Sequence, residues 1–190
     1  MKKKELVYRA ILYSFMEKRK KALTQADLAK ELKISLSTVN HALKPLRSMG
    51  SIRIKQRNFE VVNARKVLFY WASMRRLEKD IVYRTRVSRH VIDIEKGMPG
   101  DVVFGAYSAY KFMFKSVPAD YSEVYVYSND IEEIKKRFPK NENVPNLFVL
   151  KMDFDTMTLA HLFVDMWNIK EWYAMEFLKE LEEKIDGLLA

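Results

Sequence analysis

The polar side chains between Ser37 and Lys44 have the types and the spacing needed to read the edges of DNA bases. Short hydrogen-bonding groups come first and a cation follows one turn later: Ser37, Thr38, Asn40, His41 and Lys44. Hydroxyl, amide and imidazole groups can exchange hydrogen bonds with bases in the major groove, while cations bind phosphate. This stretch is therefore a candidate recognition segment for duplex DNA.

A helix must position these side chains, and the apolar residues between them predict one. Val39, Ala42, Leu43 and Leu46 recur at the i, i+3, i+4 and i+7 spacing of a buried helix face. Ser35 precedes this helix and can cap it. A shorter helix with Thr24 as its cap comes before it, with Ala26, Leu28, Ala29 and Leu32 as its small and apolar residues. Residues 24–50 therefore read as two helices joined by a tight turn.

Pro45 lies inside the second helix. Proline removes an intrahelical bond and costs about 3 kcal/mol in a regular helix interior. We expect a kink between His41 and Lys44, or a distorted last turn. Arg47 follows it and extends the cationic end of the segment.

Residues 51–62 read as a β-hairpin with a basic tip. Ile52 and Ile54 alternate with Arg53 and Lys55, and the turn is formed by Gln56-Arg57-Asn58. A basic hairpin next to a DNA-reading helix can reach phosphates or the minor groove. The candidate residues for this contact are Arg53, Lys55, Gln56 and Arg57.

An apolar stripe from Leu6 to Phe15 predicts a first helix within residues 2–21. It ends in the basic run Lys18-Arg19-Lys20-Lys21. Cations at this position suit the dipole of a helix C-terminus, and phosphate contact by Lys20 and Lys21 is equally plausible.

Eight residues at fixed spacing resemble the helix-turn-helix of winged-helix transcriptional regulators. The pattern Q-x-x-L-A-x-x-L-x-(I/V)-S-x-x-T-V is represented by Gln25, Leu28, Ala29, Leu32, Ile34, Ser35, Thr38 and Val39. The resemblance implies that residues 1–62 form a DNA-binding domain, with Ser35 at the start of the recognition helix and the hairpin as its wing. The partner that it implies is double-stranded DNA, and the activity is transcriptional regulation, for example as a repressor.

The charge distribution agrees with this interpretation. Residues 1–62 contain 15 Lys and Arg against 5 Asp and Glu, whereas residues 97–190 contain 10 against 16. Phosphate binding therefore belongs to the N-terminal part. Cysteine is absent, which excludes disulfides and thiolate metal sites. We expect a cytoplasmic protein without a signal sequence or a membrane span, and scarce glutamine with many charges indicates a thermophilic source.

Residues 63–90 are expected to form a basic, aromatic linker, with a helix from about Ala64 to Leu77 or beyond. Its broad apolar side includes Leu68, Trp71 and Ala72 and needs a cover. Either the C-terminal domain or a second copy of the chain can provide it. A homodimer is attractive because two-fold symmetric proteins read palindromic DNA.

Residues 91–190 are expected to form a small α/β domain, so that the fold class of the whole chain is α+β. Predicted strands at 102–104, 123–127 and 147–151 alternate with predicted helices. Two helices close the chain. The second, at about 170–188, should bury Trp172, Met175, Leu178 and residues of Leu181–Ile185. This domain would serve dimerisation, a small-molecule effector or a protein partner.

The order of these parts resembles regulators of the AbiE-type (abortive infection) antitoxin group. The residues that carry this second resemblance are at 105–110, 123–127 and 162–167. It implies a repressor or antitoxin whose C-terminal half binds a partner, with DNA binding serving autoregulation.

Two catalytic alternatives involve carboxylates. Gly105-Ala106 followed by Glu123 is similar to the layout of nucleotidyltransferases, but Tyr125 stands where a second metal-binding carboxylate is needed. Such a protein would be a degenerate relative. His161 and Asp165 are one helical turn apart and could share a metal, although such pairs are usually structural. We therefore expect no catalytic residue, no metal site and no cofactor.

Overall fold

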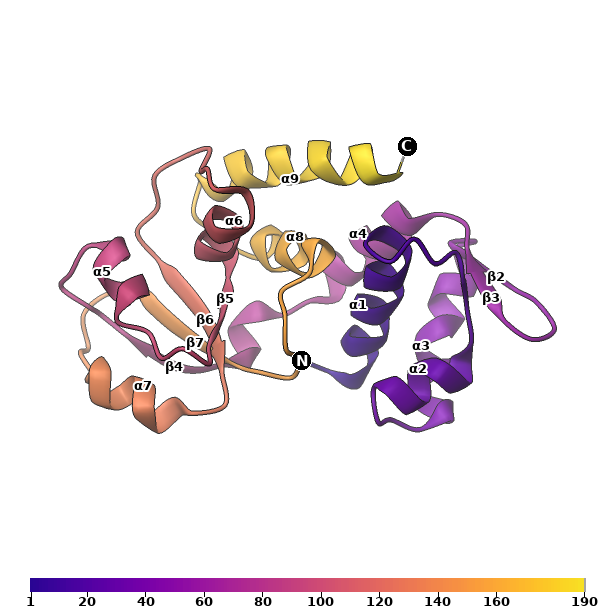
Figure 1. The fold of residues 1–190 in the computed structure, drawn as a ribbon, viewed down its shortest axis with the longest axis horizontal. Coiled ribbons are helices and arrows are strands. Elements are labelled where there is room, and N and C mark those ends of the chain that lie inside the picture. The colour runs from indigo at the N-terminus through magenta and orange to yellow at the C-terminus, as the bar shows by residue number, and fades with distance from the viewer. Residues whose placement is uncertain (190) are drawn as a thin grey trace. The chain divides into compact units, whose positions relative to one another are not determined.

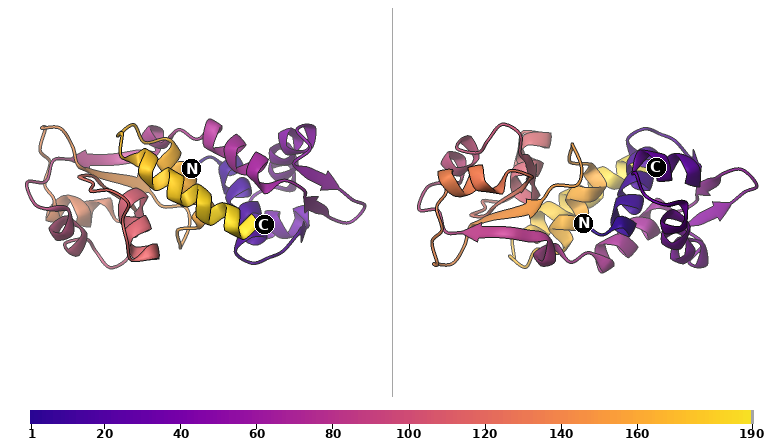
Figure 2. Two further views of the ribbon diagram at one scale, coloured as in Figure 1. Left: turned by 90° about the horizontal axis from the view of Figure 1, so that it is seen from above. Right: turned by 90° about the horizontal axis from the view of Figure 1, so that it is seen from below.

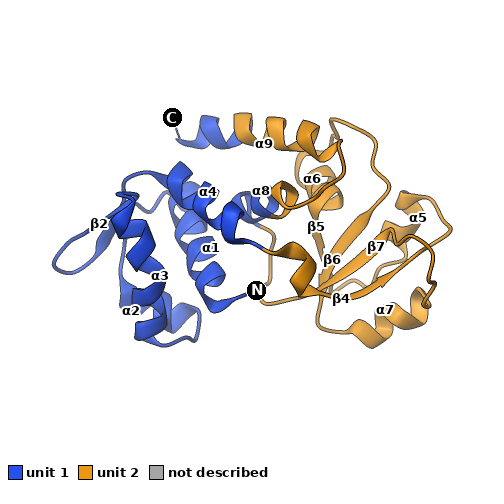
Figure 3. Cartoon of the chain, turned by 180° about the vertical axis from the view of Figure 1, so that it is seen from behind, with its two compact units in different colours: residues 1–75, 158–164, 184–190 blue, residues 76–157, 165–183 orange. Residues whose placement is uncertain are grey.

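The computed structural model describes residues 1–189, and these form two compact units (Figure 3). The first unit contains Met1–Arg75, Thr158–Val164 and the C-terminal residues from Lys184. The second contains Arg76–Met157 and Asp165–Glu183. The expected segments were 1–62, 63–90 and 91–190. The two units instead divide the expected linker 63–90 after Arg75, and the last two helices of the chain supply residues to both units.

The first unit begins with helices and a small sheet (Figure 1). Its elements up to Arg75 are α1 (Lys3–Met16), β1 (Ala22–Leu23), α2 (Gln25–Glu31), α3 (Leu36–Ser48), β2 (Ile52–Ile54), β3 (Phe59–Val61) and α4 (Ala64–Met74). Both predicted caps are formed. Oγ1 of Thr24 accepts the backbone N–H of Asp27 at 3.0 Å, and Oγ of Ser35 accepts that of Thr38 at 3.2 Å. The prediction of two helices and a tight turn is thus confirmed.

The sheet of the first unit has the order β1-β3-β2 and is antiparallel. Ile52 pairs with Val61 and Ile54 with Phe59, so the predicted hairpin is present. The loop between its strands projects beyond the helices of the unit (Figures 1 and 2). Gly50 has a φ of +68°, which allows the chain to turn sharply from α3 into β2. Strand β1 was not predicted, because two residues are too few to show an alternating pattern.

The core of the first unit joins α1, α3 and α4. Val7, Ile11 and Leu12 of α1 are completely buried, as are Val39 and Leu46 of α3. The predicted stripe on α3 is therefore its buried face.

The apolar side of α4 is covered within the first unit. The ring of Trp71 lies 5.4 Å from that of His161, and the ring of Phe69 lies 5.7 Å from that of Phe163. These partners belong to the part of α8 (Leu159–Trp167) that is in this unit. Either the C-terminal domain or a second copy of the chain was expected to pack on this side of α4. In the structure, α8 from the C-terminal part of the chain packs there.

The expected linker helix over 63–90 is wrong beyond Met74. The backbone of Arg75 is extended, with φ −62° and ψ 138°, and a short 3-10 helix follows at Leu77–Asp80. Residues 81–85 then form strand β4 (Ile81–Thr85). Tyr83 and Thr85 are buried while Val82 and Arg84 are exposed, which is the period-two pattern of a strand.

The second unit contains a mixed four-stranded sheet with the order β4-β7-β6-β5. The other strands are β5 (Val103–Gly105), β6 (Val124–Ser128) and β7 (Leu147–Lys151). β6 and β7 are parallel, and the other two pairs are antiparallel. The three predicted strands agree with β5, β6 and β7 to within one residue at each end.

Helices cover both faces of this sheet. Ile94 of α5 (Val91–Lys96) and Ile134 of α7 (Ile131–Arg137) join a buried cluster with Val124, Val126, Leu147 and Val149. On the other face, the Tyr125 ring stacks on Phe148 at 4.7 Å. Tyr107 of α6 (Ala106–Phe114) and Phe177 of α9 (Ala174–Leu189) complete this aromatic layer, with ring centroids 4.9 Å apart.

The expected buried face of the last helix is wrong at its first turns. Trp172 is 77% exposed and Met175 is 65% exposed, and α9 begins only at Ala174. Leu178, Leu181 and Ile185 are buried as expected, and Ala174 and Phe177 are buried with them.

Candidate nucleic-acid interface

The exposed face of α3 gathers four of the candidate residues. Ser37, Asn40, His41 and Lys44 line one shallow surface depression together with Leu36. All five are exposed, whereas Val39 and Ala42 between them are completely buried. Because the buried stripe anchors α3 in the core of its unit, the opposite face presents its polar groups as a set.

Ser35 and Thr38 are placed differently from the other candidates. The Ser35 hydroxyl accepts the Thr38 backbone N–H, and the two side-chain oxygens are 2.8 Å apart. Thr38 is only partly exposed. Both hydroxyls therefore stabilise the first turn of α3, and Ser35 has an established structural task as its N-cap.

Helix α3 continues through Pro45 to Ser48. Proline has no N–H, so the carbonyl of His41 lacks the usual donor four residues later. The last turn keeps backbone bonds, such as the one from the Met49 N–H to the Pro45 carbonyl at 3.0 Å, and side chains add two more. Oγ of Ser48 donates to the Lys44 carbonyl at 3.1 Å, and Oγ of Ser51 donates to the Leu46 carbonyl at 2.9 Å. Arg47 is exposed in this last turn.

The hairpin carries its cations on exposed positions. Arg53, Lys55, Gln56 and Arg57 are all exposed. The backbone N–H of Lys55 donates to the Asn58 carbonyl at 2.8 Å, so Gln56 and Arg57 form the tip. The Lys55 ammonium is bonded to the Glu60 carboxylate across the hairpin. This pairing was not expected from the sequence, and it places the one acid of the hairpin beside one of its candidate phosphate ligands.

Lys20 and Lys21 lie in the loop that precedes β1. Both are exposed and line a separate hollow with Lys18, but Asp27 and Glu31 of α2 line it too. Lys20 and Lys21 thus lie near acidic side chains, and they do not line the depression on α3.

The stretch that contains α3 and the hairpin tip is free of acids along the sequence. Between Glu31 and Glu60 there is no Asp or Glu, but six Lys or Arg occur: Lys33, Lys44, Arg47, Arg53, Lys55 and Arg57. A segment of one charge sign suits a polyanion, and Glu60, which pairs with Lys55, is the one carboxylate of the hairpin that opposes the approach of phosphates.

Comparison with known families agrees with this geometry. Residues 9–53 match a family model described as winged helix-turn-helix DNA-binding. The first unit contains a winged helix-turn-helix DNA-binding domain. The matched range extends from α1 through α3 into β2, so it includes the depression on α3. Neither the comparison with curated proteins nor that with solved structures found a match.

One residue of the depression was not singled out from the sequence. Leu36, the first residue of α3, is 54% exposed. An apolar side chain at a DNA-reading surface can contact the methyl group of thymine. No sequence pattern pointed to its exposure, because its spacing to Val39 and Leu43 is that of the buried stripe.

The residues considered for catalysis have structural surroundings. The hydroxyl of Tyr173 donates to Glu123, and that of Tyr127 donates to Asp165. His161 is buried against Trp71. Within residues 1–189, no three His, Asp or Glu side chains gather as metal ligands would. Over the same residues, no helix has the length and apolar character required to cross a membrane.

Proposed function

We propose that this protein regulates transcription by recognising specific sequences in duplex DNA with the exposed face of α3. The observation that carries the proposal is the depression lined by Ser37, Asn40, His41 and Lys44 within the matched winged helix-turn-helix domain. Asn40 has the side-chain amide that pairs with adenine through two hydrogen bonds, and Lys44 can donate to guanine or to phosphate.

The wing supplies sequence-independent affinity in this proposal. Arg53 and Arg57 contact phosphates, and Lys55 does so when it exchanges Glu60 for the DNA backbone. Gln56 at the tip, Arg47 at the end of α3, and Lys20 and Lys21 complete the proposed contact set. Each neutralised phosphate releases counterions, so binding is expected to weaken steeply as salt rises.

The regulator acts as a homodimer that represses by occupying its operator. Two-fold symmetry would place two α3 helices one turn of DNA apart, as palindromic sites require. The second unit supplies the dimer contact or the site for an effector.

A second function, that of an antitoxin-type module, is supported by a separate observation. Trp172 and Met175 of the second unit are 77% and 65% exposed. Large apolar side chains on a surface often mark a protein-binding site, and tryptophan is frequent at binding hot spots. In this function the second unit binds a protein, and DNA binding is autoregulatory.

The test is selection of bound duplexes from a randomised DNA pool, at two salt concentrations, with the full chain. Enrichment of a palindrome would support a dimeric, sequence-specific regulator. A variant with Ser37, Asn40 and Lys44 all changed to Ala should lose the enrichment, while Asn129→Ala, an exposed change in the second unit, should keep it. Salt-sensitive binding without enrichment in the wild type would refute sequence-specific recognition.

A further inference from the structure

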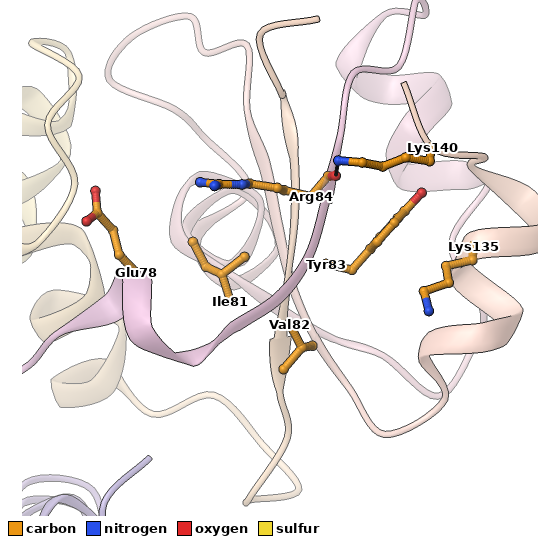
Figure 4. A pocket seen from close by; sticks show the side chains of 7 residues that line it. All are labelled: Glu78, Ile81, Val82, Tyr83, Arg84, Lys135 and Lys140. Carbon is orange, nitrogen blue, oxygen red and sulfur yellow. Dashed lines mark hydrogen bonds between the residues drawn. The ribbon is translucent and has the colours of Figure 1, made fainter. Parts of the chain in front are cut away.

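The second unit has an open groove along the edge of its sheet. In the order β4-β7-β6-β5, strand β4 has a neighbouring strand on one side only within residues 1–189. A groove of about 610 Å³ lies beside it and is lined by Ile81–Arg84 of the strand, by Glu78, and by Lys135 and Lys140. Figure 4 shows the two lysines on one side of the strand and the side chains of Arg84 and Glu78 on the other.

The backbone of Arg84 faces this groove. Its carbonyl accepts the Lys140 ammonium at 3.2 Å, so it points away from β7. In an antiparallel ladder the N–H and C=O of one residue point to the same side, so the Arg84 N–H also faces outward. Further along, the Arg86 N–H donates to the Asn141 carbonyl at 3.4 Å. This contact occupies the edge at Arg86, and only a short stretch of the strand before Arg86 has an open edge.

A bulge limits what can pair with this stretch. The register with β7 shifts between Ile81 and Tyr83, so Val82 is the extra residue, and its side chain is 51% exposed. Bulges twist an edge strand and interrupt long, flat pairing with another sheet. The edge therefore suits a short extended segment better than the whole sheet of a second copy.

The groove is cationic. Three of its lining residues are basic, and its one acid, Glu78, is already paired with Lys170 at 2.8 Å. Tyr83 points into the core beside α7, so the neighbouring Arg84 points to the opposite face of the sheet. Lys135 lies on the Tyr83 side, with its Nζ 5.9 Å from the ring centroid. A strand added at this edge would thus meet a cation on each face.

The present partners of the two lysines can be exchanged. Lys135 is paired with Glu132 at 2.7 Å and Lys140 with Glu142 at 3.5 Å, and all four side chains are well exposed. Surface ion pairs of this kind contribute little to stability. A carboxylate that arrives on a docked peptide can replace them at small cost.

We propose that this groove binds a short, extended, acidic segment of another protein, which adds to the sheet as a strand next to β4. When the segment docks, the Lys140 ammonium leaves the Arg84 carbonyl, which then accepts a main-chain hydrogen bond from the segment. The carboxylates of the segment bind Arg84, Lys135 and Lys140. Apolar side chains of the segment pack against Val82 and Ile81. This is strand addition to a sheet edge, a common mode of peptide recognition. It does not depend on DNA binding by the first unit.

The test uses the full chain and a short, capped, fluorescent peptide in which single valines alternate with pairs of glutamates, so that carboxylates lie on both faces of the added strand. Binding is followed by anisotropy. Matched peptides replace every glutamate by glutamine or by lysine. The glutamate peptide should bind, the glutamine peptide should bind more weakly, and the lysine peptide should not bind. In nuclear magnetic resonance spectra, the Arg84 amide should shift on addition of the glutamate peptide.

Charge reversal supplies the control. Lys135→Glu combined with Lys140→Glu should weaken binding of the glutamate peptide about tenfold or more, because attraction becomes repulsion. Lys136→Glu reverses the charge of the residue next to Lys135 on α7, a residue that is 77% exposed and does not line the groove. It should leave binding unchanged. Equal binding of the three peptides, or an unaffected double reversal, would overturn the proposal. So would a dimer of the wild type that Val82→Glu dissociates, because a second copy would then occupy the edge.

Discussion

The guanidinium of Arg75 lies 3.1 Å from the carboxylate of Glu5, and the two side chains are only 1% and 4% exposed. Glu5 is in the first turn of α1, and Arg75 directly follows the last residue of α4. One buried ion pair thus fastens α1 to the C-terminal end of α4 within the first unit.

Arg75→Met should destabilise the first unit by about 3–5 kcal/mol, because it leaves the Glu5 carboxylate buried without its cation. The measurement is the free energy of unfolding in urea. Adding Glu5→Leu to this variant should restore most of the loss, because apolar pairs often replace buried ion pairs well. Lys170→Met, which breaks the exposed pair with Glu78, should have little effect. A double variant as unstable as Arg75→Met would contradict this account.

Ser35→Ala should destabilise α3 by about 1 kcal/mol, because the Thr38 N–H loses its capping acceptor. Ser35→Asp keeps an acceptor and adds a negative charge at the helix N-terminus, so its stability should match that of the wild type. The same charge next to the proposed DNA-reading face should weaken DNA binding. Thermal unfolding and a DNA titration separate the two effects. Equal DNA affinity of Ser35→Asp and the wild type would remove Ser35 from the interface.

Asn40→Ala should relax base preference at one position of the selected site, at a cost of about 1–3 kcal/mol, because a bidentate contact to a base is lost. Asn40 is exposed and lines the depression on α3, so the fold should be unaffected. The measurement compares affinities for the selected duplex and for duplexes with single base changes. If Asn40→Ala keeps the full preference, another part of α3 faces the bases.

Lys55→Ala should weaken binding to all duplexes alike and reduce the slope of log affinity against log salt by about one unit. Glu60→Gln should have the opposite effect on affinity, because Lys55 then no longer has to leave a carboxylate in order to reach a phosphate. Titrations at several salt concentrations measure both slopes. An unchanged slope for Lys55→Ala would mean that the ammonium stays on Glu60 when DNA is bound.

The folded protein should lose stability as the pH rises above about 10, the ordinary pKa of tyrosine. Burial raises the pKa of Tyr107, Tyr110, Tyr121, Tyr125 and Tyr173 in the second unit, and neighbouring carboxylates raise it further. Above pH 10 these hydroxyls stay neutral in the folded chain but ionise in the unfolded chain. Alkaline pH therefore lowers the free energy of the unfolded state relative to the folded state. Unfolding free energies measured from neutral to strongly alkaline pH should show this fall.

Tyr107→Phe provides the control for this pH dependence. Within the described chain, the buried Tyr107 hydroxyl has no hydrogen-bond partner, so its removal should leave stability at neutral pH unchanged or slightly higher. The alkaline fall should become shallower, because one group fewer ionises on unfolding. If the unfolding free energy of Tyr107→Phe falls with pH as steeply as that of the wild type, Tyr107 does not contribute to the alkaline loss of stability.

Local patterns determined much of the candidate interface. The apolar spacing on α3 predicted its buried face, and the exposed polar face is simply the remainder of the same helix. Thr24 and Ser35 predicted both helix starts, because a capping bond reaches only three residues along the chain. The hairpin was also predictable, since its strands pair across a tight turn. The pairing of Lys55 with Glu60 was not expected, although it depends on the same turn.

Only the tertiary structure decided which distant segments meet. Nothing in residues 81–85 predicts that β4 pairs with β7, more than sixty residues later, or that its other edge borders a groove. The aromatic side of α4 predicted a need for cover, but not that Phe163 would provide it. Arg75 and Glu5 are seventy residues apart and carry no motif. The sequence by itself therefore determined α3 and the hairpin, because caps, turns and periodicity act over a few residues. The sheet edge, the buried ion pair and the division into units depend on long-range packing, in which many alternative partners are compatible with the same local pattern.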